Sequence, residues 1–157
     1  MKRINQLHPL SKEHHQSLVL AQKAIKACRS KNTDTISILC QKIINEYPDI
    51  WKVHFQIEEE SIFQILLERY NGTNTDSQQD EKEVVQLCKK LQQEHLTMNH
   101  YYEQMKAGNY TLLGKFGELL KQHTRTEERQ LFPVLDNFLT QDELDKIYQT
   151  SLKYRQI

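Results

Sequence analysis

A thirteen-residue pattern of histidine, glutamate and apolar residues occurs twice in this chain. The first copy, HFQIEEESIFQIL, covers residues 54–66, and the second, HTRTEERQLFPVL, covers residues 123–135. Both copies read His-x-x-x-Glu-Glu-x-x-aliphatic-Phe-x-aliphatic-Leu. Histidine and glutamate four residues apart share one face of an α-helix, so the imidazole and the carboxylate can reach one metal ion. Two such pairs predict a two-metal site, and its candidate ligands are His54, Glu58, His123 and Glu127.

A shorter repeat adds further histidines to this set. Residues 10–14 and 91–95 both read Leu-x-x-Glu-His, so the repeats alternate along the chain as short, long, short, long. This order is expected of two related helical hairpins. The repeat favours His14 and His95 as additional ligands. His15 stays an alternative to His14, because its neighbours at +3 and +4 are also apolar.

Composition indicates one helical domain. The chain has 157 residues, enough to bury a sizeable core, with only four glycines and three prolines. Lys, Glu, Gln, Leu and Ile dominate, and most of these residues favour helix. The formal net charge is zero, so neither nucleic acid nor an anionic membrane is expected as a partner.

The same sequence features predict a cytoplasmic location. No apolar run approaches the roughly 20 residues that span a bilayer, and no apolar segment follows the basic start Met1-Lys2-Arg3. Cys28, Cys40 and Cys88 are odd in number and lack Cys-x-x-Cys spacing. We therefore expect reduced, buried thiols.

Apolar periodicity predicts four long helices in an up-down-up-down bundle, an all-α fold with a short C-terminal fifth helix. The expected ranges are about 11–29, about 33–70 with a break at Pro48, about 80–106, about 110–137 with a bend at Pro133, and 140–154. Residues 71–79 form the one long polar loop. The expected N-caps are Ser11, Thr33 or Asp34, Asp49, and Thr140 in a capping box with Glu143.

The candidate ligands are expected to meet in one layer of this bundle. Counted from the turns, the ligands on the four helices differ in depth by no more than roughly one helical turn, at about 1.5 Å per residue. Each one also lies on the apolar stripe of its helix. A buried glutamate without a partner would cost several kcal/mol, and a pair of metal ions supplies that partner.

The remaining charged neighbours have simpler expected roles. Glu59 and Glu128 lie about 100° around the helix from the ligands. We expect them to carry interhelical or solvent-facing charge, with a hydrogen bond to a ligand as the alternative. His8 and His100 are expected on the surface.

These residues resemble the motifs of the hemerythrin-like (HHE cation-binding) family. The resemblance covers nearly the whole chain: the Glu-His of the first helix, both long motifs, and the Glu-His of the third helix. It implies a four-helix bundle with two non-haem iron ions, bridged by an oxo or hydroxo group and by carboxylates; zinc and manganese also suit these ligands. The implied terminal ligands are His14 or His15, His54, His95 and His123, and the implied bridges are Glu58 and Glu127.

One position departs from the family pattern. Oxygen-carrying hemerythrins have a second histidine four residues after the first one in the third helix, and here that position is Asn99. An amide oxygen binds iron weakly, so we expect an open or water-filled position at one iron. This disfavours simple reversible oxygen carriage. Tyr101 and Tyr102 lie near enough to matter, although core packing is the expected role of both.

Three functions follow as hypotheses. The first is a di-iron protein that binds O2, NO or peroxide for sensing, storage or protection. The second is an enzyme that reduces peroxide or NO, or donates iron for iron-centre repair. The third is a helical interaction module that binds no metal. The sequence predicts no catalytic residue, and we expect a monomer or weak homodimer.

Overall fold

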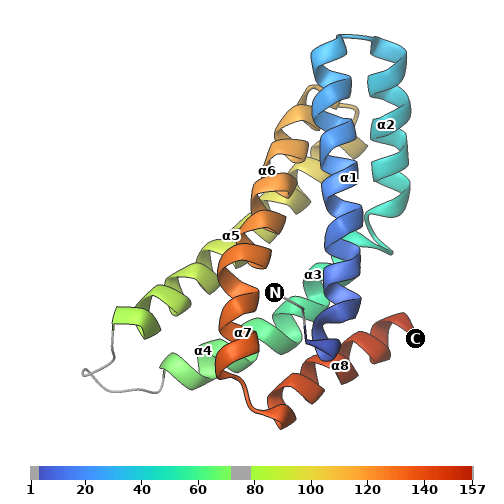
Figure 1. Ribbon diagram of the computed structural model, residues 1–157. Helices are drawn as coiled ribbons and strands as arrows, with labels where there is room; N and C mark the ends of the chain where they lie inside the picture. The colour runs from blue at the N-terminus through green and yellow to red at the C-terminus, as the bar shows by residue number, and fades with distance from the viewer. Residues whose placement is uncertain (1–3, 72–78, 157) are drawn as a thin grey trace.

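The fold is an all-α bundle, as predicted (Figure 1). The structure is a computed structural model that describes residues 4–71 and 79–156. Four helical stretches run alternately up and down, and a further helix crosses one end of the bundle (Figure 1). None of the helices within the described ranges is long and apolar enough to cross a membrane.

The four stretches of the bundle are built from several helical segments each. The first contains a 3-10 turn, η1 (Asn5–Leu7), and α1 (His8–Ser30). The second contains α2 (Thr33–Glu46), α3 (Trp51–Glu58), η2 (Glu59–Phe63) and α4 (Gln64–Asn71). The third is α5 (Gln79–Lys106). The fourth contains η3 (Tyr110–Leu112), α6 (Leu113–Thr126), η4 (Glu127–Leu131) and α7 (Phe132–Phe138), and the crossing helix is α8 (Gln141–Arg155).

The predicted break at Pro48 and the predicted start of the last helix are confirmed. The second stretch is interrupted around Pro48, between the end of α2 and the start of α3. Thr140 and Glu143 form the predicted capping box of α8, with both side chain-to-backbone hydrogen bonds present. Most of the predicted polar loop, 71–79, lies outside the described residues.

Three predicted N-caps are wrong. α1 begins three residues before Ser11, because Pro9 fits the first turn of a helix, where its missing N–H is not needed. Asn32 caps α2 instead of Thr33 or Asp34, and its side chain accepts a hydrogen bond from the backbone of Thr35. At α3 the residue in the cap position is Ile50, and no side chain caps that helix.

Both copies of the thirteen-residue pattern contain a π-helical turn near the inward glutamate. In the second copy the backbone N–H of Phe132 donates to the carbonyl of Glu127, five residues earlier. Pro133 does not explain these turns, because the first copy has Gln64 in the corresponding position. A π turn carries an extra residue, so more consecutive side chains face inward, and residues 61–63 are all buried. Such turns are frequent at functional sites.

Two apolar clusters make up the core, and they lie on either side of the predicted ligand layer. The cluster near the α1–α2 turn includes Leu20, Tyr47, Phe55, Met98 and Phe116. The cluster near α8 includes residues such as Leu10, Phe63, Leu91 and Phe132. Along each helix the candidate ligands fall between residues of the two clusters, so this layer is enclosed by apolar side chains.

At Gly117, helix α6 lies very close to α1. A Cβ added there would lie 2.9 Å from the Cβ of Ala24 and 3.1 Å from the carbonyl oxygen of Ala21. Because that oxygen belongs to a helix backbone, the two helices must move apart. We expect Gly117→Ala to destabilise the metal-free protein by about 1–3 kcal/mol, although alanine favours helix. Its thermal midpoint should fall by several degrees.

Gly114→Ala is the matched control. Its added Cβ would lie 3.2 Å from the Sγ of Cys28, the end of a side chain that can rotate. We expect this variant to keep or raise the thermal midpoint, since it gains helix propensity. Equal midpoints for the two variants would contradict the close approach at Gly117.

Candidate metal centre

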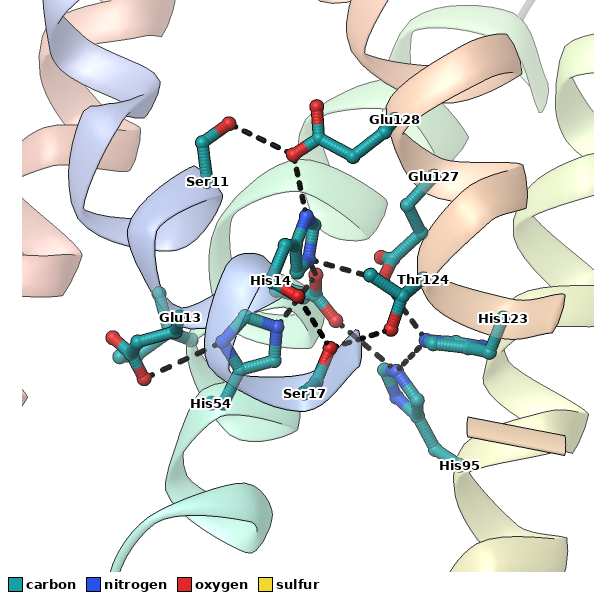
Figure 2. Close-up of polar contacts among 12 residues, drawn as sticks. Ser11, Glu13, His14, Ser17, His54, His95, His123, Thr124, Glu127 and Glu128 are labelled. Atoms are coloured by element: carbon teal, nitrogen blue, oxygen red, sulfur yellow. Dashed lines mark hydrogen bonds and ion pairs between the residues drawn. The ribbon is translucent and has the colours of Figure 1, made fainter. Parts of the chain in front are cut away.

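Four histidines and two glutamates from different helices meet in one buried layer (Figure 2). His14 comes from α1, His54 and Glu58 from α3, His95 from α5, His123 from α6, and Glu127 from the start of η4. Each of the six side chains is at most 5% exposed. The structure therefore brings together the predicted ligands from all four stretches, and α1 contributes one of its two candidate histidines.

His15 lies outside this layer. Its side chain is exposed and lines a shallow surface hollow with Val19 and Trp51. One residue along a helix is a rotation of about 100°, so α1 can turn only one of the two adjacent histidines inward. The packing of α1 against α6 selects His14.

The six side chains form two overlapping groups that could each hold a metal ion. One group is His14, His54, Glu58 and Glu127, and the other is His95, His123, Glu58 and Glu127. Within each group the donor atoms lie within 4.8 Å of one another. The two glutamates are common to both groups, so the layer has room for two neighbouring ions.

Glu58 has the geometry of a bridging carboxylate. Its Oε2 lies 3.3 Å from His14 Nε2 and 3.2 Å from His54 Nε2. Its Oε1 lies 3.1 Å from His95 Nε2. One oxygen therefore faces each group of histidines. On the second side, His95 and His123 turn their Nε2 atoms toward each other at 3.1 Å.

Glu127 supplies an independent reason to expect a cation. Its Oε1 lies 3.0 Å from His123 Nε2 and 3.3 Å from His14 Nε2. Neither contact is aligned as a hydrogen bond, and both Glu127 oxygens are buried without a hydrogen-bond partner among the described residues. In the metal-free protein its partners are the protonated imidazoles of His123 and His14, and a metal ion at this position would replace them as the cation that a buried carboxylate requires. The donor set thus fits the cations that imidazole and carboxylate bind.

A glutamate from a neighbouring helix contacts the outer nitrogen of every inward histidine. These four glutamates, which we call the outer carboxylates, each stand next to a candidate ligand in the sequence. The Nδ1–Oε1 contacts are His14–Glu128 at 2.7 Å, His123–Glu94 at 2.9 Å, His95–Glu59 at 3.3 Å and His54–Glu13 at 3.4 Å.

The outer carboxylates form a closed circuit around the bundle. The histidine on α3 contacts a carboxylate from α1, and the histidine on α5 contacts one from the segment after α3. The histidine on α6 contacts a carboxylate from α5, and the histidine on α1 contacts one from η4. A carboxylate hydrogen-bonded to Nδ1 fixes the tautomer and orientation of a histidine and leaves Nε2 directed at the centre, as at His14, His95 and His123. At His54 the 3.4 Å contact is not aligned as a hydrogen bond among the described residues. Glu59 and Glu128 therefore have the second of their two predicted roles, a hydrogen bond to a candidate ligand.

Glu13 and Glu94 were not among the residues predicted for the site. The signal was present in the shorter repeat, because both residues are the glutamate of its Glu-His pair. Two buried hydroxyls were also missed. Ser17 Oγ donates to the carbonyl of His14 and lies 2.8 Å from Thr124 Oγ1, beside the cluster (Figure 2). A small polar residue on an apolar stripe was their only sequence signal.

Residues after His95 on α5 lie outside both groups. Asn99 is half-buried and belongs to neither set of candidate ligands among the described residues. Tyr102 is buried and stacks on Tyr47, with ring centroids 4.3 Å apart. Tyr101 packs against the same apolar cluster. The expectation that both tyrosines serve core packing is confirmed.

In the metal-free protein, carboxylates make His14 and His123 hold protons tightly. Burial by itself lowers the pKa of His123, but Glu127 and Glu94 outweigh burial and raise this pKa to about 10. The pKa of His14 is raised well above its ordinary value by Glu127, Glu128 and Glu58, again against burial. Conversely, the histidines hold the pKa of Glu58 well below its ordinary range, despite burial. Metal binding must therefore release protons.

These pKa shifts predict how the stability of the metal-free protein depends on pH. The contribution of His123 is fully present below its ordinary pKa of 6.5 and is lost as the pH rises toward 10. The contribution of Glu58 is present above its ordinary pKa of 4.5 and is lost as the pH falls below that value. We expect the thermal midpoint to fall by several degrees between pH 6.5 and 10.

Thermal unfolding of metal-free and metal-loaded protein across pH 5–10 checks this expectation. The metal-loaded protein should show a flatter alkaline side, because the ion replaces the protons as the partner of the carboxylates. A metal-free midpoint that stays constant from pH 6.5 to 10 would contradict the ion pairing described for His123.

Comparison with known proteins gives one match. The family model described as the hemerythrin HHE cation binding domain matches residues 7–137. No curated protein and no solved structure matches the chain. The matched range contains both groups of candidate ligands and all four outer carboxylates, and it ends before α8.

Proposed function

This chain belongs to the hemerythrin HHE cation-binding domain family, and from that premise we propose that it is a non-haem di-iron protein. Its site would bind a small ligand, O2, NO or peroxide, for sensing, storage or protection. The observation that carries the proposal is Glu58, with one carboxylate oxygen facing each group of histidines. That geometry suits two ions bridged by one carboxylate.

The donor set favours iron over the alternatives. Each half of the site combines two histidines with the shared glutamates, and two histidines with a carboxylate and open positions are typical of non-haem iron that meets oxygen. Zinc and manganese suit the same atoms. Iron, when bound, would supply one-electron chemistry and a position for a diatomic ligand or peroxide.

The protein itself would control access and polarity at this site. The two apolar clusters enclose the ligand layer and would keep bulk water from the bound ligand. The outer carboxylates would hold the histidines in one orientation, which supports repeated binding of the same ion. The paired hydroxyls of Ser17 and Thr124 lie beside the cluster and could form a hydrogen bond with the ligand.

An enzymatic function is the second candidate, and Asn99 is the observation that favours it. Because Asn99 stands where a third histidine would join His95 and His123, a metal ion held there would keep one coordination position open for exchange. Reduction of peroxide or NO, or donation of iron for iron-centre repair, would use such a place. For either function we expect a cytoplasmic monomer or weak homodimer.

Metal content together with anaerobic and aerobic absorption spectra tests the proposal. We expect about two iron ions per chain after aerobic loading, with a charge-transfer band of an oxo-bridged pair. Well under one iron per chain would overturn both candidates. Stopped-flow oxidation of the di-ferrous protein then separates them: a stable oxygen adduct supports ligand binding, and repeated turnover with peroxide supports an enzyme.

A further inference from the structure

The C-terminal helix α8 lies beyond the matched family range, yet its last residue contacts one of the outer carboxylates. It packs against α3, η1, η2 and α1 at one end of the bundle (Figure 1). Its last residue, Arg155, points back toward α1 and the start of α3. The guanidinium is largely enclosed, at 19% exposure of the side chain.

Arg155 makes three hydrogen bonds there. Its Nη1 donates to the carbonyl of Asp49 at 2.8 Å, and its Nη2 donates to the carbonyl of Ile50 at 2.6 Å. Nη2 also donates to Oε1 of Glu13 at 2.6 Å. A short contact between a guanidinium and a carboxylate is among the stronger hydrogen bonds in proteins. Arg155 therefore joins the turn before α3 to an outer carboxylate on α1.

Both ends of this link converge on His54. The carbonyl of Ile50 that accepts from Arg155 also accepts the backbone N–H of His54, at 2.9 Å. The Glu13 oxygen bound to Arg155 is the one that faces His54 Nδ1, at 3.4 Å. Arg155 thus holds the backbone turn that carries His54 and the carboxylate that faces its ring.

The His54–Glu13 contact is also the longest of the four outer contacts. Because Glu13 shares one oxygen between Arg155 and His54, its position depends on where Arg155 stands. Removal of the arginine side chain would free Glu13 to turn toward solvent and would loosen the first turn of α3.

We propose that Arg155 is a positioning residue of the metal centre: through Glu13 and the first turn of α3 it orients His54. Docking of α8 thereby sets how tightly the position formed by His14 and His54 holds its ion. This inference rests on the proposed metal-binding function, and it assigns to the segment outside the family match a direct influence on one of the two ion positions.

Titration of the metal-free protein with Co(II), followed by its visible absorption, tests the proposal. We expect Arg155→Ala to weaken one of the two binding steps by about 10- to 100-fold, the usual effect of losing an outer partner of a metal-bound histidine. The other step should be unchanged. Arg155→Lys should recover part of the loss, because it keeps the charge but not the planar fork of donors.

Arg69→Ala is the matched control. Arg69 anchors the opposite end of α8, where its Nη1 donates to the carbonyl of Phe138 and lies 3.2 Å from Glu143 Oε1. Glu13 is held by Arg155 and not by Arg69, so this variant should lower the thermal midpoint without changing either binding step. Equal effects of Arg69→Ala and Arg155→Ala on affinity would reduce Arg155 to a structural anchor and overturn the proposal.

Glu13→Gln separates the two routes from Arg155 to His54, because glutamine keeps the size of the side chain and leaves the bonds to Asp49 and Ile50 in place. We expect it to weaken the same step as Arg155→Ala. Unchanged or tighter Co(II) binding in both variants would overturn the inference. Absence of Co(II) and iron binding in the wild-type protein would instead overturn the proposed function, so the two failures are distinguishable.

Discussion

Replacement of Glu58 by alanine is expected to abolish tight binding of both metal ions. Glu58 is fully buried and directs a different carboxylate oxygen at each pair of histidines. Without Glu58, each ion would have only two histidines and the shared Glu127 as ligands. Less negative charge would then balance the positive charges of the two ions. We expect iron content to fall from about two to below about 0.2 per chain, since removal of one partner of a buried ion pair costs about 3–5 kcal/mol.

Metal analysis of purified protein after aerobic iron loading gives the result. Glu60→Ala is the control, because Glu60 lies two residues away and contacts Gln56 on the outer side of the helix. It should retain two ions. Glu58→Gln keeps the volume of the side chain and covers the case in which the alanine variant does not fold. Two ions in a folded Glu58 variant would show that this carboxylate does not bridge.

The pairing of the histidines has the second largest expected effect. The double variant His14→Ala/His54→Ala should lose one ion and keep the other at nearly the wild-type affinity. This is expected because both histidines belong to one group, while the second group keeps its own pair and both glutamates. The complementary variant His95→Ala/His123→Ala should behave in the same way.

A third double variant, with the same number of substitutions, provides the contrast. His54→Ala/His123→Ala removes one histidine from each group, so neither position keeps its donor set. We expect the loss of both ions at the concentrations that saturate the other two variants. Isothermal titration with Co(II) distinguishes one remaining site from none. The same stoichiometry in all three double variants would contradict the pairing.

Helix content and the residues that meet as candidate ligands were largely predictable because their signals are local. The spacing of four residues between His54 and Glu58 determines a shared face without reference to the rest of the chain. The capping box at Thr140 and Glu143 was predictable for the same reason. The cap at Asn32 was not, since three adjacent residues could all serve, and the chain path out of the preceding turn selects among them.

The choice between His14 and His15 depended on a contact between segments far apart in the sequence. Both residues have apolar neighbours along α1, so periodicity could not separate them. Packing of α1 against α6 turns His14 inward and leaves His15 exposed. The contacts of Glu59, Glu94 and Glu128 have the same origin, because each joins two different helices.

By itself, the sequence of this protein determined an all-α bundle and the types of residue that meet in its centre, because the repeat sets the helix faces and the turns set the depth of each ligand. Only the tertiary structure decided which two histidines lie together in one group of candidate ligands, which glutamate contacts which histidine, and that Arg155 reaches Glu13. These features depend on which helices are neighbours and how each is rotated about its axis. Because successive residues of a helix are rotated by about 100°, a shift of one position in the sequence decides whether a side chain faces the centre of the bundle or its surface.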